Sequence, residues 1–99
     1  MNGFQTAWDG EGVARYVIAH RDPGMANWLD TSGVPVGFMT FRWTYGAAPA
    51  EVPVVRVEKV ALAAVAGRFG DAAPRVSAEE RRRTIAMRRA HIQRRYRQY

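Results

Sequence analysis

The segment of residues 37–45, Gly-Phe-Met-Thr-Phe-Arg-Trp-Thr-Tyr, alternates apolar and polar side chains, and this pattern is the strongest constraint on what the chain can form. Successive side chains of a strand point to opposite faces, so one face of this segment would be apolar. That face carries Met39, Phe41, Trp43 and Tyr45. The alternation therefore predicts a strand whose apolar face has to be covered by another part of a protein.

Two further runs are rich in the β-branched and aromatic residues that favour strands. Residues 13–20 lie between two turn-forming stretches, and residues 52–60 have Pro53 near their start, where a strand tolerates a missing N–H. The connections are too short for helical crossovers, so the three strands should pair antiparallel as a meander. We therefore expect a β-rich α+β fold built on an antiparallel sheet of about three strands.

Two helices are expected after the strands. Residues 61–69 place apolar side chains near helical spacing, and Gly70 follows as a stop signal. Ser77 and Glu80 form an S-x-x-E capping box, in which each side chain satisfies an unpaired N–H at the start of a helix. The predicted organisation is a small antiparallel β unit with a short helix (residues 1–76) and a basic C-terminal helix (residues 77–99).

The net charge of the chain lies in this predicted C-terminal helix. Of the 99 residues, those from 77 onward include eight arginines and two glutamates, which account for the whole formal charge of +6. A helix of this composition docks on protein through a narrow apolar stripe, binds nucleic-acid phosphate or contacts an acidic membrane surface. The last is the least favoured, because the stripe lacks Trp, Phe and Leu. The stripe comprises Ile85, Ile92, Tyr96 and Tyr99, and the phosphate contacts would come from Arg83, Arg88, Arg94 and Arg95. Docking is the favoured reading, because no nucleic-acid recognition fold accompanies the arginines.

The aromatic content exceeds what a three-stranded sheet and one short helix can bury. We expect the missing cover to come from a second subunit or from chain upstream of Met1. The alternative is that the C-terminal helix folds back over the sheet.

One polar loop, residues 20–33, is the candidate for ligand binding. His20 with Asp22 or Asp30 could act as a base with an orienting carboxylate, and Arg42 could bind an anion or pair with one of these aspartates. The structural alternative is stronger, because this loop is rich in residues that hydrogen-bond the backbone of turns. The candidate ligand-binding set is His20, Asp22, Asn27, Trp28, Asp30 and Arg42.

Several classes of function lack support in the sequence. With no cysteine the chain has no disulfide, no thiolate metal site and no thiol nucleophile. No phosphate-binding loop, dinucleotide fingerprint, zinc-protease or serine-hydrolase motif occurs, so we expect no metal, no cofactor and no catalytic residue. No apolar run is long enough to span a membrane and no secretory signal is visible, which predicts a cytoplasmic protein with no membrane partner.

Residues 27–33, Asn-Trp-Leu-Asp-Thr-Ser-Gly, followed by a strand-like run that ends in Arg42-Trp43, resemble the C-terminal part of an uncharacterised family of bacterial proteins. The arginine-rich end of the chain is similar to that family's basic helical end. The resemblance implies a β-sandwich-like region in a domain of unknown function, preceded by further chain. Members often have histidine or charged residues after the loop glycine, where this chain has Val34-Pro35-Val36, and no catalytic residue carries over.

The sequence thus predicts a non-catalytic accessory, assembly or ligand-binding domain, as part of a larger protein or as a subunit of a homo-oligomer. The alternative is a nucleic-acid-binding module that uses the arginine-rich helix. An enzyme with its site in the polar loop ranks third.

Overall fold

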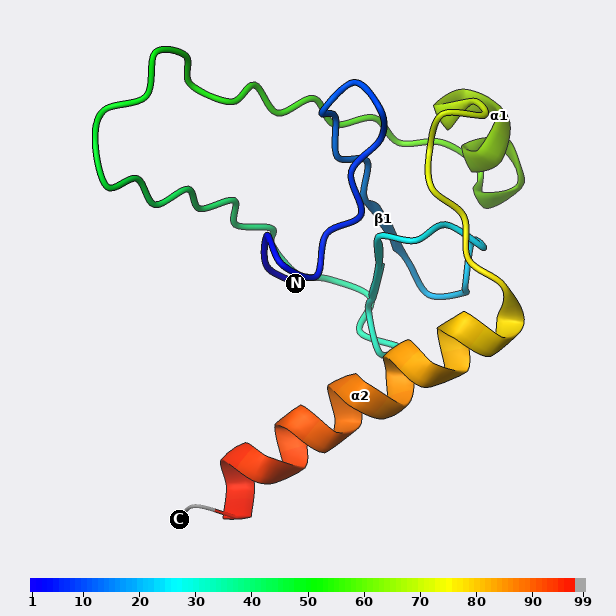
Figure 1. Cartoon of the computed structure of the whole chain (residues 1–99). Helices are drawn as coiled ribbons and strands as arrows, with labels where there is room; N and C mark the ends of the chain where they lie inside the picture. The colour runs from blue at the N-terminus through cyan, green and yellow to red at the C-terminus, as the bar shows by residue number, and fades with distance from the viewer. Residues whose placement is uncertain (98–99) are drawn as a thin grey trace.

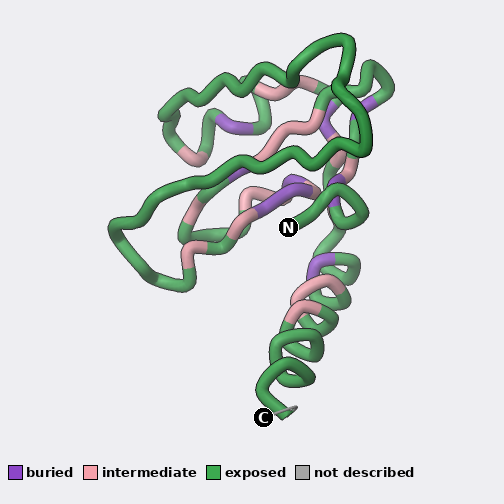
Figure 2. The backbone as a smooth tube through the Cα atoms, turned by 90° about the vertical axis from the view of Figure 1, so that its left-hand side faces the viewer, coloured by how far each residue is buried: buried purple, intermediate pink, exposed green. Residues whose placement is uncertain are grey.

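The computed structural model describes residues 1–97, and over that range five elements are joined by long stretches of irregular chain (Figure 1). In chain order they are β1 (Val17–Ala19), β2 (Trp28–Asp30), the 3-10 helix η1 (Leu62–Ala64), α1 (Val65–Phe69) and α2 (Ala78–Arg97). The C-terminal half of α2 projects away from the rest of the molecule (Figure 2).

β1 and β2 form a parallel pair, with Val17 opposite Trp28. The expected antiparallel sheet of about three strands is therefore wrong. That expectation assumed that a connection too short for a helix cannot return the chain for parallel pairing, and it placed the first connection at residues 21–36. The connection between β1 and β2 is shorter still, residues 20–27. It returns the chain without a helix, because hydrogen bonds to a distant part of the chain hold the connection in place.

The segment just before α2 supplies those hydrogen bonds. The N–H of Ala26 donates to the C=O of Pro74 at 2.9 Å, and the N–H of Val76 donates to the C=O of Gly24 at 3.1 Å. Gly24 has a φ of 73°, a left-handed conformation that glycine adopts without the steric cost of a Cβ. Residues 74–76 therefore complete the small body that carries β1 and β2.

A small hydrophobic core lies where β1, its following loop and α1 meet (Figure 2). Its buried members are Val17, Met25, Val65 and Ala73, with Ala19, Leu62 and Phe69 packed against them. Val65 and Phe69 are four residues apart in α1 and share one face, so this short helix is stabilised by packing rather than by its own hydrogen bonds. The core draws on segments far apart in the sequence.

Residues 34–60 leave this body as a long open arm, which we call the arm (Figure 1). Its two limbs, residues 37–45 and 52–60, carry the strand pattern, but neither is a strand. No backbone hydrogen bond joins residues 35–60 to one another or to any other described residue. Alternation favours a strand, but a strand forms only where another backbone pairs with it. The predictions of a β-rich fold and a β-sandwich-like unit are therefore wrong.

Both predicted helical regions are confirmed. η1 and α1 follow one another over residues 62–69, and Gly70, with a φ of 72°, ends α1. At the start of α2 the N–H of Ser77 donates to the Glu80 carboxylate at 2.7 Å, and the N–H of Glu80 donates to Ser77 Oγ at 3.2 Å. The bond from the N–H of Ser77, with a smaller contribution from the Ser77 hydroxyl, lowers the pKa of the Glu80 carboxyl. Within residues 1–97, no helix has both the length and the apolar character needed to cross a membrane.

Candidate functional site

Asn27 is the most deeply buried polar residue of the predicted site, with 2% of its surface exposed. Its Oδ1 accepts the N–H of Ala7 at 2.8 Å, and its Nδ2 donates to the C=O of Ala7 at 2.8 Å and of Arg15 at 3.0 Å. Both amide protons are therefore in use. Asn27 ties the N-terminal segment to the chain around β1, which is a structural role.

Trp28 lies with its ring in the body, 6% exposed, and its indole Nε1 donates to the C=O of Ala19 at 3.0 Å. The guanidinium carbon of Arg81 is 5.1 Å from the ring centre, within the range of a cation–π contact. The aromatic ring is thus held by β1 on one side and by the first turns of α2 on the other.

Arg81 is the buried charge at this junction. Its Nε donates to the Asp22 carboxylate at 2.9 Å, and one Nη donates to the C=O of Met25. Its other Nη is buried and has no hydrogen-bond partner among the described residues. A buried guanidinium needs a carboxylate, and Asp22 supplies it while also accepting the N–H of Gly24 at 2.8 Å. This pair fastens α2 to the β1–β2 connection, and nothing in the sequence distinguishes Arg81 from its seven neighbouring arginines.

The remaining predicted ligand residues do not converge. His20 Nδ1 is hydrogen-bonded to the hydroxyl of Thr31, and Asp30 accepts the N–H of Ser32 at 2.8 Å. Arg42 is exposed on the arm and, within residues 1–97, forms an ion pair with neither Asp22 nor Asp30. The expected pairing of Arg42 is therefore not formed, and ligand binding by this set of residues stays a prediction.

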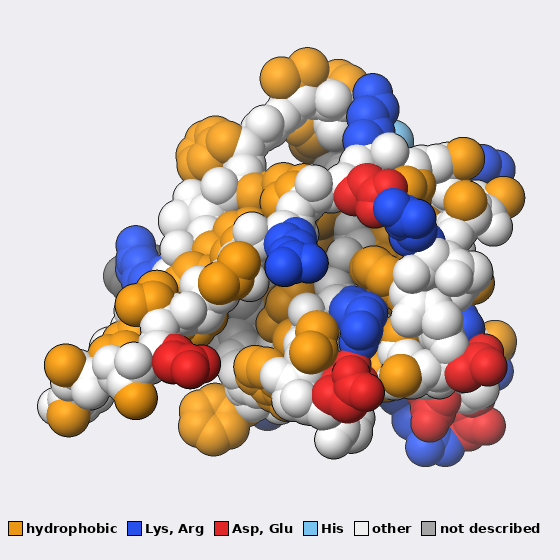
Figure 3. Space-filling view, turned by 90° about the horizontal axis from the view of Figure 1, so that it is seen from above, with side chains coloured by type: hydrophobic (Ala, Val, Ile, Leu, Met, Phe, Trp, Pro, Cys, Tyr) orange, Lys and Arg blue, Asp and Glu red, His pale blue; other side chains and the backbone are white. Residues whose placement is uncertain are grey.

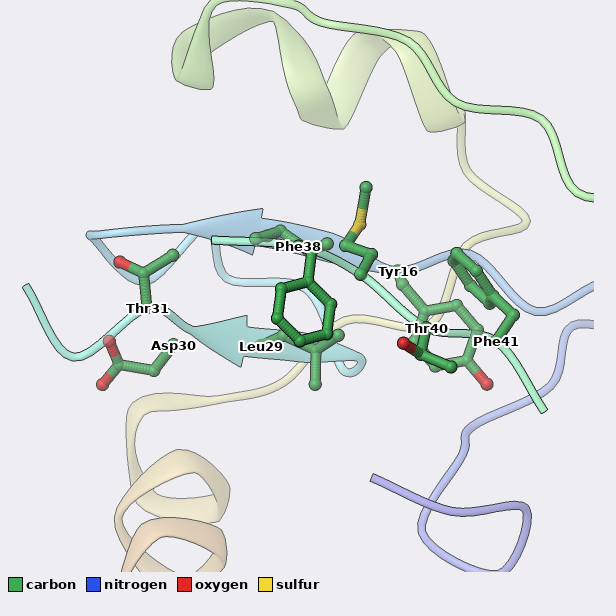
Figure 4. A pocket seen from close by; sticks show the side chains of 9 residues that line it. Tyr16, Leu29, Asp30, Thr31, Phe38, Thr40 and Phe41 are labelled. Carbon is green, nitrogen blue, oxygen red and sulfur yellow. The ribbon is translucent and has the colours of Figure 1, made fainter. Parts of the chain in front are cut away.

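An open hollow of about 290 Å³ lies beside β1 and β2, where the first limb of the arm passes over them (Figure 4). Asp30 and Thr31 stand at one end of it, and Tyr16 and Phe41 at the other. The lining between them is apolar and comes from Ile18, Leu29, Phe38 and Met39. This apolar face is only partly covered by the chain itself.

The arm exposes a series of large apolar side chains (Figure 3). Phe38 is 94% exposed and Val54 is 82% exposed. Single exposed hydrophobic residues are common on protein surfaces, whereas a contiguous series marks an interaction site. The exposed members of the first limb are Phe38, Met39, Phe41, Trp43 and Tyr45, and those of the second limb are Val52, Val54, Val55, Val57 and Val60.

The apolar stripe of α2 contributes little to holding this helix on the body. Ile85 is half-buried, whereas Ile92 and Tyr96 are exposed, and Tyr99 lies outside the described residues. Besides Arg81, the side chain of Arg88 makes the contact, because its Nη1 donates to the C=O of Trp28 at 3.1 Å. Arginine side chains therefore hold the first half of α2, and no sequence signal pointed to this.

The four arginines proposed for nucleic acid have different surroundings. Arg83 pairs with Glu79 on the same helix, and Arg88 lies against the body. Arg94 and Arg95 are exposed on the projecting half of α2 and have no ion-pair partner within residues 1–97. Of these four arginines, only Arg94 and Arg95, on the distal half of the helix, are exposed with no ion-pair partner among the described residues.

Asp9 is a second carboxylate held by the body. Its Oδ1 accepts the N–H groups of Val13 and Glu11, each at 2.9 Å, and Arg15 pairs with its other oxygen. The hydrogen bond from Val13 is the main reason that the pKa of Asp9 is lower than its ordinary value, and it outweighs the opposing effect of burial. Because every contact is local, Asp9 shapes the turn before β1.

Among residues 1–97, no three histidine, aspartate or glutamate side chains come together as ligands for a metal ion. Comparison of the chain with protein-family models, curated proteins and solved structures gave no match. The resemblance to the uncharacterised bacterial family therefore stays a prediction.

Proposed function

We propose that this chain is a non-catalytic assembly unit whose arm docks on another polypeptide. The observation that carries the proposal is the state of residues 35–60, whose backbone is unpaired within the described chain and whose apolar side chains are exposed. An unpaired extended backbone is a template for pairing with another chain. Such strand addition takes its affinity from main-chain hydrogen bonds and its specificity from alternate side chains.

The charge distribution supports docking through the arm rather than through α2. The arm carries Arg42, Glu51, Arg56, Glu58 and Lys59, so its charges nearly cancel, whereas the basic residues concentrate in α2. Surfaces that bury apolar area are depleted of charge at their centre. The arm has this composition and α2 does not.

The experiment is analytical ultracentrifugation of the full chain over micromolar concentrations, with a variant that replaces Phe38, Val54 and Val57 by serine. We expect the chain to associate and the variant to remain monomeric with unchanged circular dichroism, because these side chains are exposed and add little to the fold. Phe4→Ser is the matched control, since Phe4 is equally exposed but lies outside the arm. A monomeric wild-type chain, or equal association of the arm variant, would overturn the proposal.

A second candidate, nucleic-acid binding, is supported by the free arginines on the projecting half of α2. Phosphate contacts release counterions, so affinity should fall steeply as salt is raised. Replacing Arg94 and Arg95 by glutamine should weaken binding of duplex DNA and reduce its salt dependence, whereas Arg83→Gln, on the half next to the body, should have little effect. Binding that is absent at near-physiological salt, or equal in both variants, would exclude this function for α2.

A further inference from the structure

The second limb of the arm contains one run that can pair over its whole length. Every residue from 52 to 60 is exposed, and none of their backbone groups is hydrogen-bonded within the described chain. Pro53 has no N–H and bounds the run on one side. Ala61, the residue that caps η1, bounds it on the other. The run that remains is residues 54–60, and its central residue is Val57.

We infer that two copies of this chain associate by antiparallel pairing of residues 54–60, with Val57 of one copy opposite Val57 of the other. The inference rests on the proposed assembly function and adds the identity of the partner. An antiparallel pair centred on one residue has two-fold symmetry, so it closes as a dimer and leaves no repeating surface.

Charge complementarity favours this register over those centred on either neighbouring residue. With Val57 at the centre, Arg56 of each copy lies directly opposite Glu58 of the other, so the ladder contains two pairs of opposite charge. Directly opposed side chains share a face of the ladder and interact, and opposite charges at such positions favour pairing. Centring on Arg56 or on Glu58 instead would place like charges opposite each other.

The apolar residues of the run fit the same register. Val54 of one copy lies opposite Val60 of the other on the face that also carries the charge pairs, and the two Val57 side chains meet on the second face. Val54 and Val57 are among the exposed valines of the arm, at 82% and 69%. Pairing covers these side chains and satisfies the N–H and C=O groups of alternate residues, which point toward the partner strand.

Glu58 also has a partner within its own chain. Arg68 of α1 donates to both of its oxygens, at 2.7 and 2.8 Å, and both side chains are more than half exposed. A carboxylate has about four lone-pair sites, so it can accept Arg68 and the Arg56 of a second copy together. The Arg68 contact orients the Glu58 carboxylate and leaves acceptor sites open for a second arginine.

The test is a charge exchange across the ladder. In a dimer of Arg56→Glu chains, or of Glu58→Arg chains, both opposite-charge pairs become like-charge pairs, and we expect each variant alone to dimerise about tenfold more weakly than wild type. An equimolar mixture of the two variants restores both pairs, so it should form a 1:1 heterodimer with near wild-type affinity. Sedimentation equilibrium gives the affinities, and native mass spectrometry identifies the heterodimer.

Two controls isolate the register. Lys59→Glu makes the same change in net charge as Arg56→Glu, but Lys59 would face Val55, so dimerisation should change little. Arg68→Gln removes the contact within one chain and should leave the dimer in place.

This register would be overturned if all these variants associated equally, or if the two mixed variants bound each other no more tightly than each binds itself. Assembly through the arm would still stand. A wild-type chain that stays monomeric at high micromolar concentration would overturn both. Open-ended oligomers would also overturn the two-fold pairing.

Discussion

Replacing Trp28 by alanine tests whether the junction of β1 and α2 is the centre of stability. The ring is 6% exposed, so its removal leaves a cavity, and a buried Trp→Ala change costs about 3–5 kcal/mol in the free energy of unfolding. Trp28→Phe keeps most of the apolar surface but loses the 3.0 Å hydrogen bond to Ala19, which should cost about 1 kcal/mol. It also weakens the contact with Arg81.

Urea unfolding followed by far-ultraviolet circular dichroism measures these differences, because α2 dominates the helical signal. Trp8→Ala is the matched control, since Trp8 is 55% exposed and its loss should cost under about 1 kcal/mol. The reasoning is refuted if the Trp28→Ala midpoint matches wild type, or if Trp28→Phe costs as much as Trp28→Ala.

Three further predictions concern charge and docking. Asp22→Asn should destabilise the chain by about 1–3 kcal/mol in urea, because it leaves Arg81 buried without a counter-charge; an unchanged midpoint would show that Arg81 is solvated. Because folding lowers the pKa of Asp9, its stabilisation is present above the ordinary pKa and lost as pH falls through the folded value, so the melting-temperature deficit of Asp9→Asn should shrink in acid; a constant deficit would contradict this. Ile85→Ser should lower the melting temperature more than Ile92→Ser, since only Ile85 is half-buried; equal shifts would show that Ile85 adds nothing to the contact of α2 with the body.

The helices could be predicted because their signals are local. The Ser77–Glu80 capping box and Gly70 act on neighbouring residues. In the structure the capping box starts α2 and Gly70 ends α1, as predicted. The strands could not be predicted in the same way. β2 begins at Trp28, inside a stretch that carries turn residues, and it exists because Val17 lies opposite and residues 74–76 hold the connecting loop.

The candidate site was likewise predictable only in part. The sequence singled out Asn27, Trp28 and Asp22, and all three lie at contacts that hold the body together. It did not single out Arg81, because an arginine becomes a buried anchor only when a carboxylate and an aromatic ring from another segment surround it. No local sequence pattern specifies that the guanidinium, the carboxylate and the ring come together.

By itself, the sequence determined the long basic helix, its starting residue and the apolar alternation of the arm, since each depends on residues within one or two turns or along one strand. The tertiary structure decided that β1 and β2 run parallel, that α2 is held through arginines, and that the two limbs of the arm remain unpaired. The physical reason is that strand pairing and charge burial both require a partner from elsewhere in the chain, or from another chain.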